Sequence, residues 1–78
     1  MLDSHIVLLT RYNYKGLTLF QILSNIRKTF NSSIDYHSIL NICTRMIDKG
    51  ILQKTKNKNG VIVYKLYNIY RDGQQDNS

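Results

Sequence analysis

Residues 35–67 decide the fold, and they read DYHSILNICTRMIDKGIL followed by QKTKNKNGVIVYKLY. In the first part, apolar residues recur at helical spacing and form one stripe, which consists of Ile39, Ile42, Cys43, Met46 and Ile47. Asp35 precedes this stripe and suits the N-cap position. After the stripe, Lys49 supplies a cation in the last turn, and Gly50 can adopt the left-handed conformation that ends a helix. The pattern predicts an amphipathic helix that ends next to Gly50.

The second part of this stretch predicts a β-hairpin. Ile51 and Leu52 start the first strand, and residues 61–67 return with alternating faces and many β-branched or aromatic side chains. Asn59-Gly60 lies between the two runs and suits a two-residue type I′ turn. We therefore expect two short antiparallel strands directly after the helix.

A second helix is expected before residue 31. Thr18 precedes Gln21 by the spacing of a capping box, in which each side chain accepts a hydrogen bond from the other residue's backbone amide. The apolar face of this helix is predicted to contain Leu19, Ile22, Leu23, Ile26 and Phe30. Asn-Ser-Ser at 31–33 then ends the helix.

The N-terminal segment, residues 4–14, is also expected to be helical, with Asp3 or Ser4 as its cap. Its predicted stripe consists of Ile6, Leu9 and Asn13, with Val7 and Leu8 beside them. Gly16 breaks this helix, and residues 16–18 are too short for anything but a turn or a minimal strand.

Length and composition indicate one small domain. The chain has 78 residues and is 42% hydrophobic, which is apolar enough for a compact core. We expect this domain to span residues 1–70, followed by a frayed polar tail at 71–78. The single cysteine, Cys43, excludes an intramolecular disulfide and is expected to be a core residue. There is no signal peptide pattern and no long apolar run, so we expect the whole chain to be a cytoplasmic protein without a membrane partner.

The charge balance points to a polyanionic partner. Eleven Lys and Arg residues oppose five Asp residues, for a net charge of +6 at pH 7. Such a chain attracts nucleic acid by non-specific Coulomb forces. Abundant Ile, Asn, Lys and Tyr, with no Ala, Pro or Trp, are typical of AT-rich coding DNA, which is common in low-GC bacteria and their mobile genetic elements.

The predicted elements give the fold class α+β. Three helices, the last two separated by a short turn, followed by a basic hairpin, are the order of a winged helix-turn-helix with a two-stranded β-hairpin wing. Residues 35–66 resemble the recognition helix and wing in the N-terminal domain of the penicillinase-repressor family, whose C-terminal dimerisation region has no counterpart in this sequence. The residues that match that family's pattern are Ser38, Thr44, Arg45, Lys49, Gly50, Ile51 and Leu52. The resemblance implies a DNA-binding regulator.

The candidate site combines one face of the third helix with the predicted wing. The helical wheel places six residues outward or near the boundary of the apolar stripe, with Arg45 beside the stripe: Tyr36, His37, Leu40, Asn41, Thr44 and Asp48. Asn41 suits a bidentate pair with adenine, whereas Tyr36, His37 and Thr44 suit base edges or phosphates. Any solvated helix can present a similar polar face, so the alternative is that this face has no partner.

The lysines of the predicted wing are the second part of the candidate site. Lys54, Lys56 and Lys58 stand at alternate positions, so in a regular strand they project from one face and suit a phosphate backbone. Lysines that only protect a sheet edge from aggregation would show the same spacing. Tyr64, Tyr67 and Tyr70 are further candidates, for stacking on unpaired bases. Tyrosines of a strand are more often β-forming residues with a half-buried ring, and this alternative stays open.

No enzyme is expected. The sequence has no glycine-rich phosphate loop, no paired catalytic carboxylates and no metal-ligand spacing, so we expect neither a cofactor nor a metal ion. Our first hypothesis is a small transcriptional regulator that binds double-stranded DNA. The alternative is an accessory protein of a phage, plasmid or cassette that binds single-stranded DNA or docks onto a replication enzyme. A homodimer and a protein-protein contact through Leu40 or Ile69 also stay open.

Overall fold

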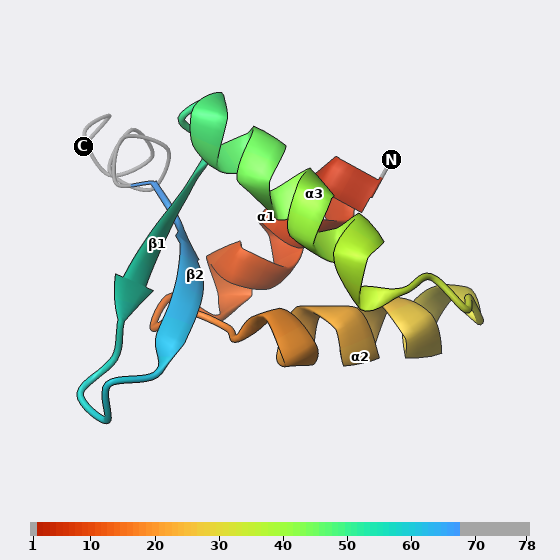
Figure 1. The fold of residues 1–78 in the computed structure, drawn as a ribbon, viewed down its shortest axis with the longest axis horizontal. Coiled ribbons are helices and arrows are strands. Elements are labelled where there is room, and N and C mark those ends of the chain that lie inside the picture. Colours follow the sequence, from red (N-terminus) through yellow and green to blue (C-terminus); the bar gives the residue numbers. More distant parts are fainter. Residues whose placement is uncertain (1, 68–78) are drawn as a thin grey trace.

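The structure is a computed structural model that describes residues 2–67 (Figure 1). It is an α+β domain with three helices followed by a two-stranded antiparallel hairpin, which confirms the predicted fold class and its winged-helix-like topology. The elements are α1 (Leu2–Tyr12), α2 (Leu19–Phe30), α3 (Tyr36–Asp48), β1 (Leu52–Lys56) and β2 (Ile62–Leu66). The predicted domain end at residue 70 and the polar tail at 71–78 lie outside the described residues.

Local capping interactions define the second and third helices, as predicted. The Thr18 hydroxyl oxygen accepts a hydrogen bond from the Gln21 amide at 3.1 Å, and the Gln21 side chain accepts one from the Thr18 amide at 2.9 Å. Asp35 accepts a hydrogen bond from the Ser38 amide at 2.8 Å and so caps α3. At the other end of α3, Gly50 adopts the left-handed φ of +77° that the sequence pattern predicts.

The core lies between the three helices and one face of the hairpin. Its buried members are Ile6, Leu19, Ile22, Leu23, Ile26, Ile39, Cys43, Met46, Leu52, Tyr64 and Leu66. Most of them come from the predicted apolar stripes of α2 and α3, and Leu40 packs against this cluster with partial burial. Phe30 was wrongly predicted to join them, because it is the last residue of α2 and is 42% exposed, with its ring 4.9 Å from that of His5.

The inward face of α1 differs from the prediction. The helix begins at Leu2, so the predicted caps Asp3 and Ser4 lie inside it. Its buried residues are Ile6 and Thr10, not the predicted stripe through Leu9 and Asn13. A threonine can be buried here because its hydroxyl donates a hydrogen bond to the Ile6 carbonyl at 2.8 Å within the same helix.

The hairpin is a two-stranded sheet with one further bridge to the segment before α2. β1 pairs with β2 from Leu52↔Leu66 to Lys56↔Ile62. On the other edge of β2, the Leu17 amide donates to the Tyr64 carbonyl at 3.0 Å, and the Tyr64 amide donates to the Leu17 carbonyl at 2.7 Å. The predicted minimal strand at 16–18 is therefore confirmed, as a single bridge at Leu17 that connects the hairpin to the segment before α2.

Gly16 makes this bridge possible. Its φ is +100°, a conformation that residues with a side chain rarely adopt. A Cβ atom at this position would also lie 2.7 Å from Cγ2 of Val63 on β2. No other residue fits here without strain.

The turn of the hairpin is longer than predicted, and the type I′ assignment is wrong. The Asn57 amide donates to the Val61 carbonyl at 2.9 Å, and the Gly60 amide donates to the Asn57 carbonyl at 2.9 Å. The Asn57 side chain accepts hydrogen bonds from the amides of Asn59 and Val61, while Gly60 has a φ of +81°. These contacts form a three-residue loop that ends in a left-handed glycine. They move Lys58 out of the strand and into the turn.

Candidate nucleic-acid interface

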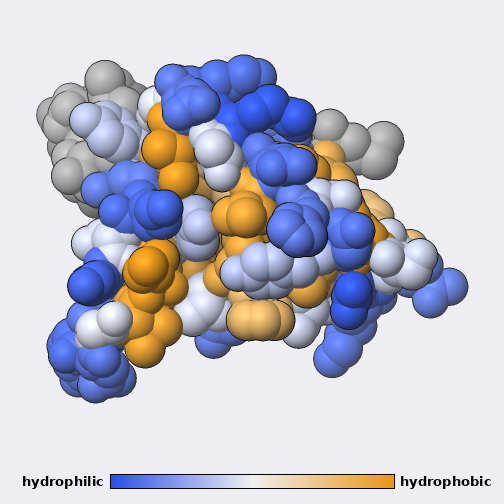
Figure 2. All heavy atoms as spheres, viewed as in Figure 1, coloured by the Kyte–Doolittle hydropathy of each residue, from blue (hydrophilic) through white to orange (hydrophobic). Residues whose placement is uncertain are grey.

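The outer face of α3 carries one continuous exposed stripe, as the sequence predicts. This outer stripe consists of His37, Asn41, Thr44 and Asp48, and the exposed Arg45 lies beside it. The opposite face is buried through Ile39, Cys43 and Met46. Figure 2 shows hydrophilic side chains gathered over the C-terminal half of α3.

Tyr36 lies at the start of α3, on the side that faces the hairpin. Its ring centroid is 5.1 Å from that of Phe20 on α2 and 6.3 Å from that of His37. Tyr36 and Lys54 line the same pocket. The structure therefore brings two of the predicted site residues together here, one from α3 and one from β1.

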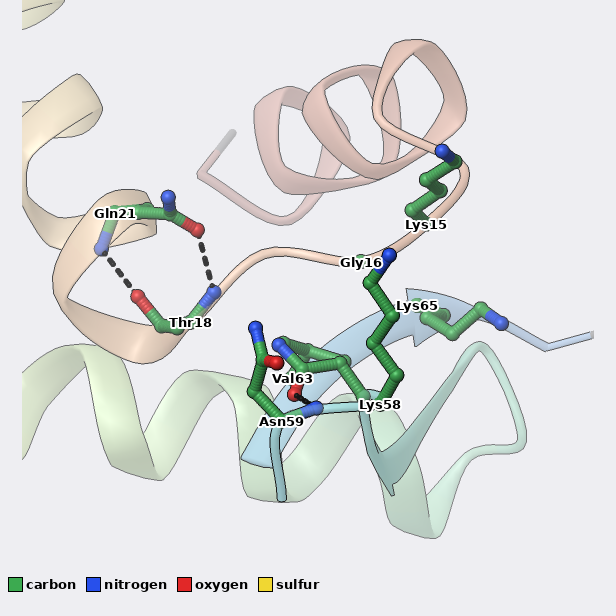
Figure 3. A pocket seen from close by; sticks show the side chains of 9 residues that line it. Lys15, Gly16, Thr18, Gln21, Lys58, Asn59, Val63 and Lys65 are labelled. Carbon is green, nitrogen blue, oxygen red and sulfur yellow. Dashed lines mark hydrogen bonds between the residues drawn. The ribbon is translucent and has the colours of Figure 1, made fainter. Parts of the chain in front are cut away.

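The three lysines of the predicted row do not share one face. Lys54 and Lys56 alternate with Thr55 on β1 and stand opposite Tyr64 and Ile62, on the face that packs against the helices. Lys58 instead lines a pocket on the other face (Figure 3). The predicted row is wrong at Lys58 because the strand ends at Lys56 and the turn redirects the chain.

The pocket at Lys58 gathers two lysines that the sequence analysis did not select. Its volume is about 490 Å³, and it is lined by Lys15, Gly16, Thr18, Gln21, Asn57, Lys58, Asn59, Val63 and Lys65. Lys15 comes from the loop before α2 and Lys65 from β2, and Figure 3 shows Lys58 reaching from the turn toward Gly16. The signal that would have found Lys15 is the minimal strand, since its pairing with β2 places Lys15 beside the hairpin.

The hairpin is uniformly cationic. Its charged residues are Lys54, Lys56, Lys58 and Lys65, with no Asp or Glu between residues 52 and 67. The acidic residues in the described part of the chain are Asp3 on α1 and two residues at the ends of α3, Asp35 and Asp48. The backbone hydrogen bond from Ser38 lowers the pKa of Asp35 below its ordinary value, so this carboxylate stays charged at neutral pH.

Two titratable groups are buried where α3 meets the hairpin. Desolvation raises the pKa of the Cys43 thiol to about 11, which fits its predicted place in the core. Burial also raises the pKa of Tyr64, which is only 5% exposed. Of the two interpretations of Tyr64, burial supports the strand tyrosine with a buried ring and excludes stacking, whereas Tyr67 is exposed and Tyr70 lies outside the described residues.

Within residues 2–67, no group of three His, Cys, Asp or Glu side chains is placed to hold a metal ion. None of the helices in this part of the chain has both the length and the hydrophobicity needed to cross a membrane.

Comparison with known proteins gives no match to a family model, a curated protein or a solved structure. The resemblance to the penicillinase repressors therefore depends on the sequence pattern of residues 35–66. The winged-helix-like topology is shown by the order of the three helices and the hairpin in the structure.

Proposed function

We propose that this domain binds DNA as a small regulator, with the hairpin on phosphates and the outer stripe of α3 toward the bases. One observation carries the proposal: every charged side chain of the hairpin is a lysine, and these lysines occupy both of its faces. Cations that neutralise phosphates release condensed counterions, and this release supplies most of the non-specific affinity for DNA.

The two-faced arrangement suits a ribbon that lies between two phosphate chains. Lys54 and Lys56 would reach one chain, while Lys58 and Lys65 would reach the other, with Lys15 close to the second pair. A row of lysines on a single face would contact only one backbone. The split therefore favours binding in or across a groove of duplex DNA over binding along one strand of it.

The outer stripe of α3 would contribute selectivity. Asn41 lies in the middle of this stripe and can donate to and accept from the edge of adenine. Asp48 lies at its C-terminal end and repels phosphates. Asp35 repels phosphates at the other end of the helix, so the middle of α3, around Asn41, is the part that would approach the bases.

The second candidate is the accessory protein that binds single-stranded DNA or docks onto a replication enzyme. Two exposed aromatic rings, Phe20 and Tyr36, favour it because an intact duplex offers no free base faces for stacking.

The test compares binding of the full chain to a duplex of random sequence and to a single strand of equal length, at two salt concentrations. We expect the affinity to fall as salt rises. Replacing Lys54, Lys56 and Lys58 with alanine should lower the dependence of log K on log salt by about 3 units, at ~0.9 per lost phosphate contact. Unchanged binding in this triple variant would remove the hairpin from the proposal.

A second measurement concerns Asn41. In a selection from random duplexes, a regulator should prefer one sequence by about 10³-fold or more over random duplex. Asn41→Ala should relax that preference at one base position, by about 1–3 kcal/mol, and leave non-specific binding unchanged. Absence of any sequence preference in the unmodified chain would contradict the regulator and leave the accessory protein.

A further inference from the structure

A groove separates the hairpin from the first turns of α2 and α3. It is lined by Thr18, Leu19, Phe20, Tyr36, Lys54, Gly60, Val61, Ile62 and Tyr64, and its volume is about 500 Å³. Figure 2 shows hydrophobic surface over the distal half of the hairpin, on the same view as the outer face of α3. We call this feature the aromatic groove.

The apolar side chains at the mouth of the aromatic groove are strongly exposed. Phe20 is 66% exposed, Ile62 47%, Val61 45% and Tyr36 38%. The core does not use Phe20, because the buried stripe of α2 consists of its neighbours Leu19, Ile22, Leu23 and Ile26. Exposed apolar clusters that the core does not need mark sites of interaction.

The charge of the groove restricts what can occupy it. Lys54 is the charged residue that lines it, and Lys56 follows on the same face of β1. None of the acidic residues described, which are Asp3, Asp35 and Asp48, lies among the lining residues. The groove thus offers flat apolar rings beside a cation, and a nucleobase with its phosphate presents a flat ring beside an anion.

We propose that the aromatic groove is a stacking platform for unpaired nucleobases, with Lys54 on the adjoining phosphate. The inference rests on the second candidate function, binding of single-stranded DNA, and names the surface that would hold the single-stranded or locally unpaired bases. The rings of Phe20 and Tyr36 are tilted by 44° to one another, so each can offer its own exposed face to a base. In a continuous duplex the bases cover one another's faces, so these rings find stacking partners only where the strands are open.

The test uses the full chain and three probes of equal length: a thymidine single strand, an abasic strand with the same number of phosphates, and a duplex. Phe20→Ala should weaken binding to the thymidine strand by about 5- to 100-fold, as expected for the loss of one stacked base. Binding to the abasic strand and the duplex should change by less than about twofold. Tyr36→Ala should show the same pattern.

Two further variants separate stacking from apolar contact and from general surface effects. Phe20→Leu keeps an apolar side chain without a ring and should lose affinity, whereas Phe20→Tyr should retain it. Tyr12→Ala removes an aromatic ring that is 77% exposed on α1, away from the groove, and should have no effect. Thermal unfolding of each variant confirms that the fold persists.

Three results would overturn the inference: an unchanged thymidine affinity in Phe20→Ala, an equal loss on the duplex, or an equal loss on the abasic strand. Each leaves the proposed function standing if the unmodified chain still binds a polynucleotide in a salt-dependent way. Failure of the unmodified chain to bind any of the three probes would instead reject the proposed function itself. Full thymidine affinity in Phe20→Leu would overturn the inference as well, because an apolar side chain without a ring cannot stack on a base.

Discussion

The outer stripe of α3 and the hairpin present opposite chemistry on neighbouring parts of the molecule. The outer stripe has directional polar groups, such as the Asn41 amide, and its nearby charges, Arg45 and Asp48, cancel. The hairpin has four lysines and no acid, but lysine is a point charge with little directional preference. In the proposed function the hairpin would therefore attract DNA, and the outer stripe of α3 would select its sequence. Attraction by lysines depends far less on an exact fit than recognition of a base by Asn41.

The largest expected effect comes from breaking the connection between the hairpin and the helices. Gly16→Ala should lower the free energy of unfolding by about 2–4 kcal/mol, because it adds a strained φ and a contact with Val63 that is too short. Gly60→Ala is the matched control, since Gly60 also has a positive φ but nothing within 4 Å of the added Cβ. Denaturant unfolding measures both, and equal losses would mean that the close approach to Val63 does not matter.

The next effect separates the two faces of the hairpin. Removing the Lys54/Lys56 pair or the Lys58/Lys65 pair, each by substitution with Gln, should weaken DNA binding by about 50- to 100-fold near 0.1 M salt. Lys28→Gln with Lys49→Gln removes the same charge outside the hairpin and should cost much less. Titrations at several salt concentrations give the slopes. A loss confined to one pair would mean that only one face of the hairpin meets phosphate.

The free energy of unfolding should fall at alkaline pH, because Cys43 is buried where α3 meets the hairpin. The pKa of Cys43 is about 11 in the folded protein against an ordinary value of 9.0, so the fold favours the protonated thiol. The corresponding stability is present below pH 9 and is lost as the pH rises toward 11. Unfolding measured from pH 8 to 11 should show a steeper decline in the unmodified chain than in Cys43→Ala. Parallel curves would contradict the burial of this thiol.

The smallest expected effect tests whether the outer stripe faces the polyanion at all. Asp48→Asn should raise DNA affinity by about two- to fivefold, because a repelling charge leaves the proposed interface. Asp3→Asn on α1 removes the same charge elsewhere and should have a weaker effect. Equal effects of the two substitutions, measured in the same titration, would mean that α3 does not lie closer to the DNA than α1.

Local signals explain which parts of the fold could be predicted from the sequence. The capping box at Thr18 and Gln21, the Asp35 cap and the left-handed Gly50 each depend on a few adjacent residues, and all three were predicted correctly. The outer stripe of α3 followed from helical periodicity once that helix was recognised. Among the predicted site residues, those on a regular helix were therefore placed best.

The errors occurred where the outcome depends on side chains or on distant segments. The register of the turn is set by hydrogen bonds to the Asn57 side chain, which an Asn-Gly pattern does not reveal. The burial of Thr10 depends on how α1 packs against the other elements and on a hydroxyl that bonds its own helix. Phe20 lies off the apolar stripe of α2, and its meeting with Tyr36 and Lys54 in the aromatic groove depends on how α2, α3 and β1 pack together.

The bridge between Leu17 and Tyr64 has a consequence for how the domain assembles. Helix caps and the hairpin form between neighbours in the chain, so they can appear within microseconds. The bridge joins Leu17 and Tyr64, which are far apart in the chain, and closing so long a loop costs entropy before the contact returns any energy. Docking of α1 and the Leu17 segment onto β2, the most distant of these contacts in sequence, is therefore expected to be slow compared with the formation of the caps and the hairpin.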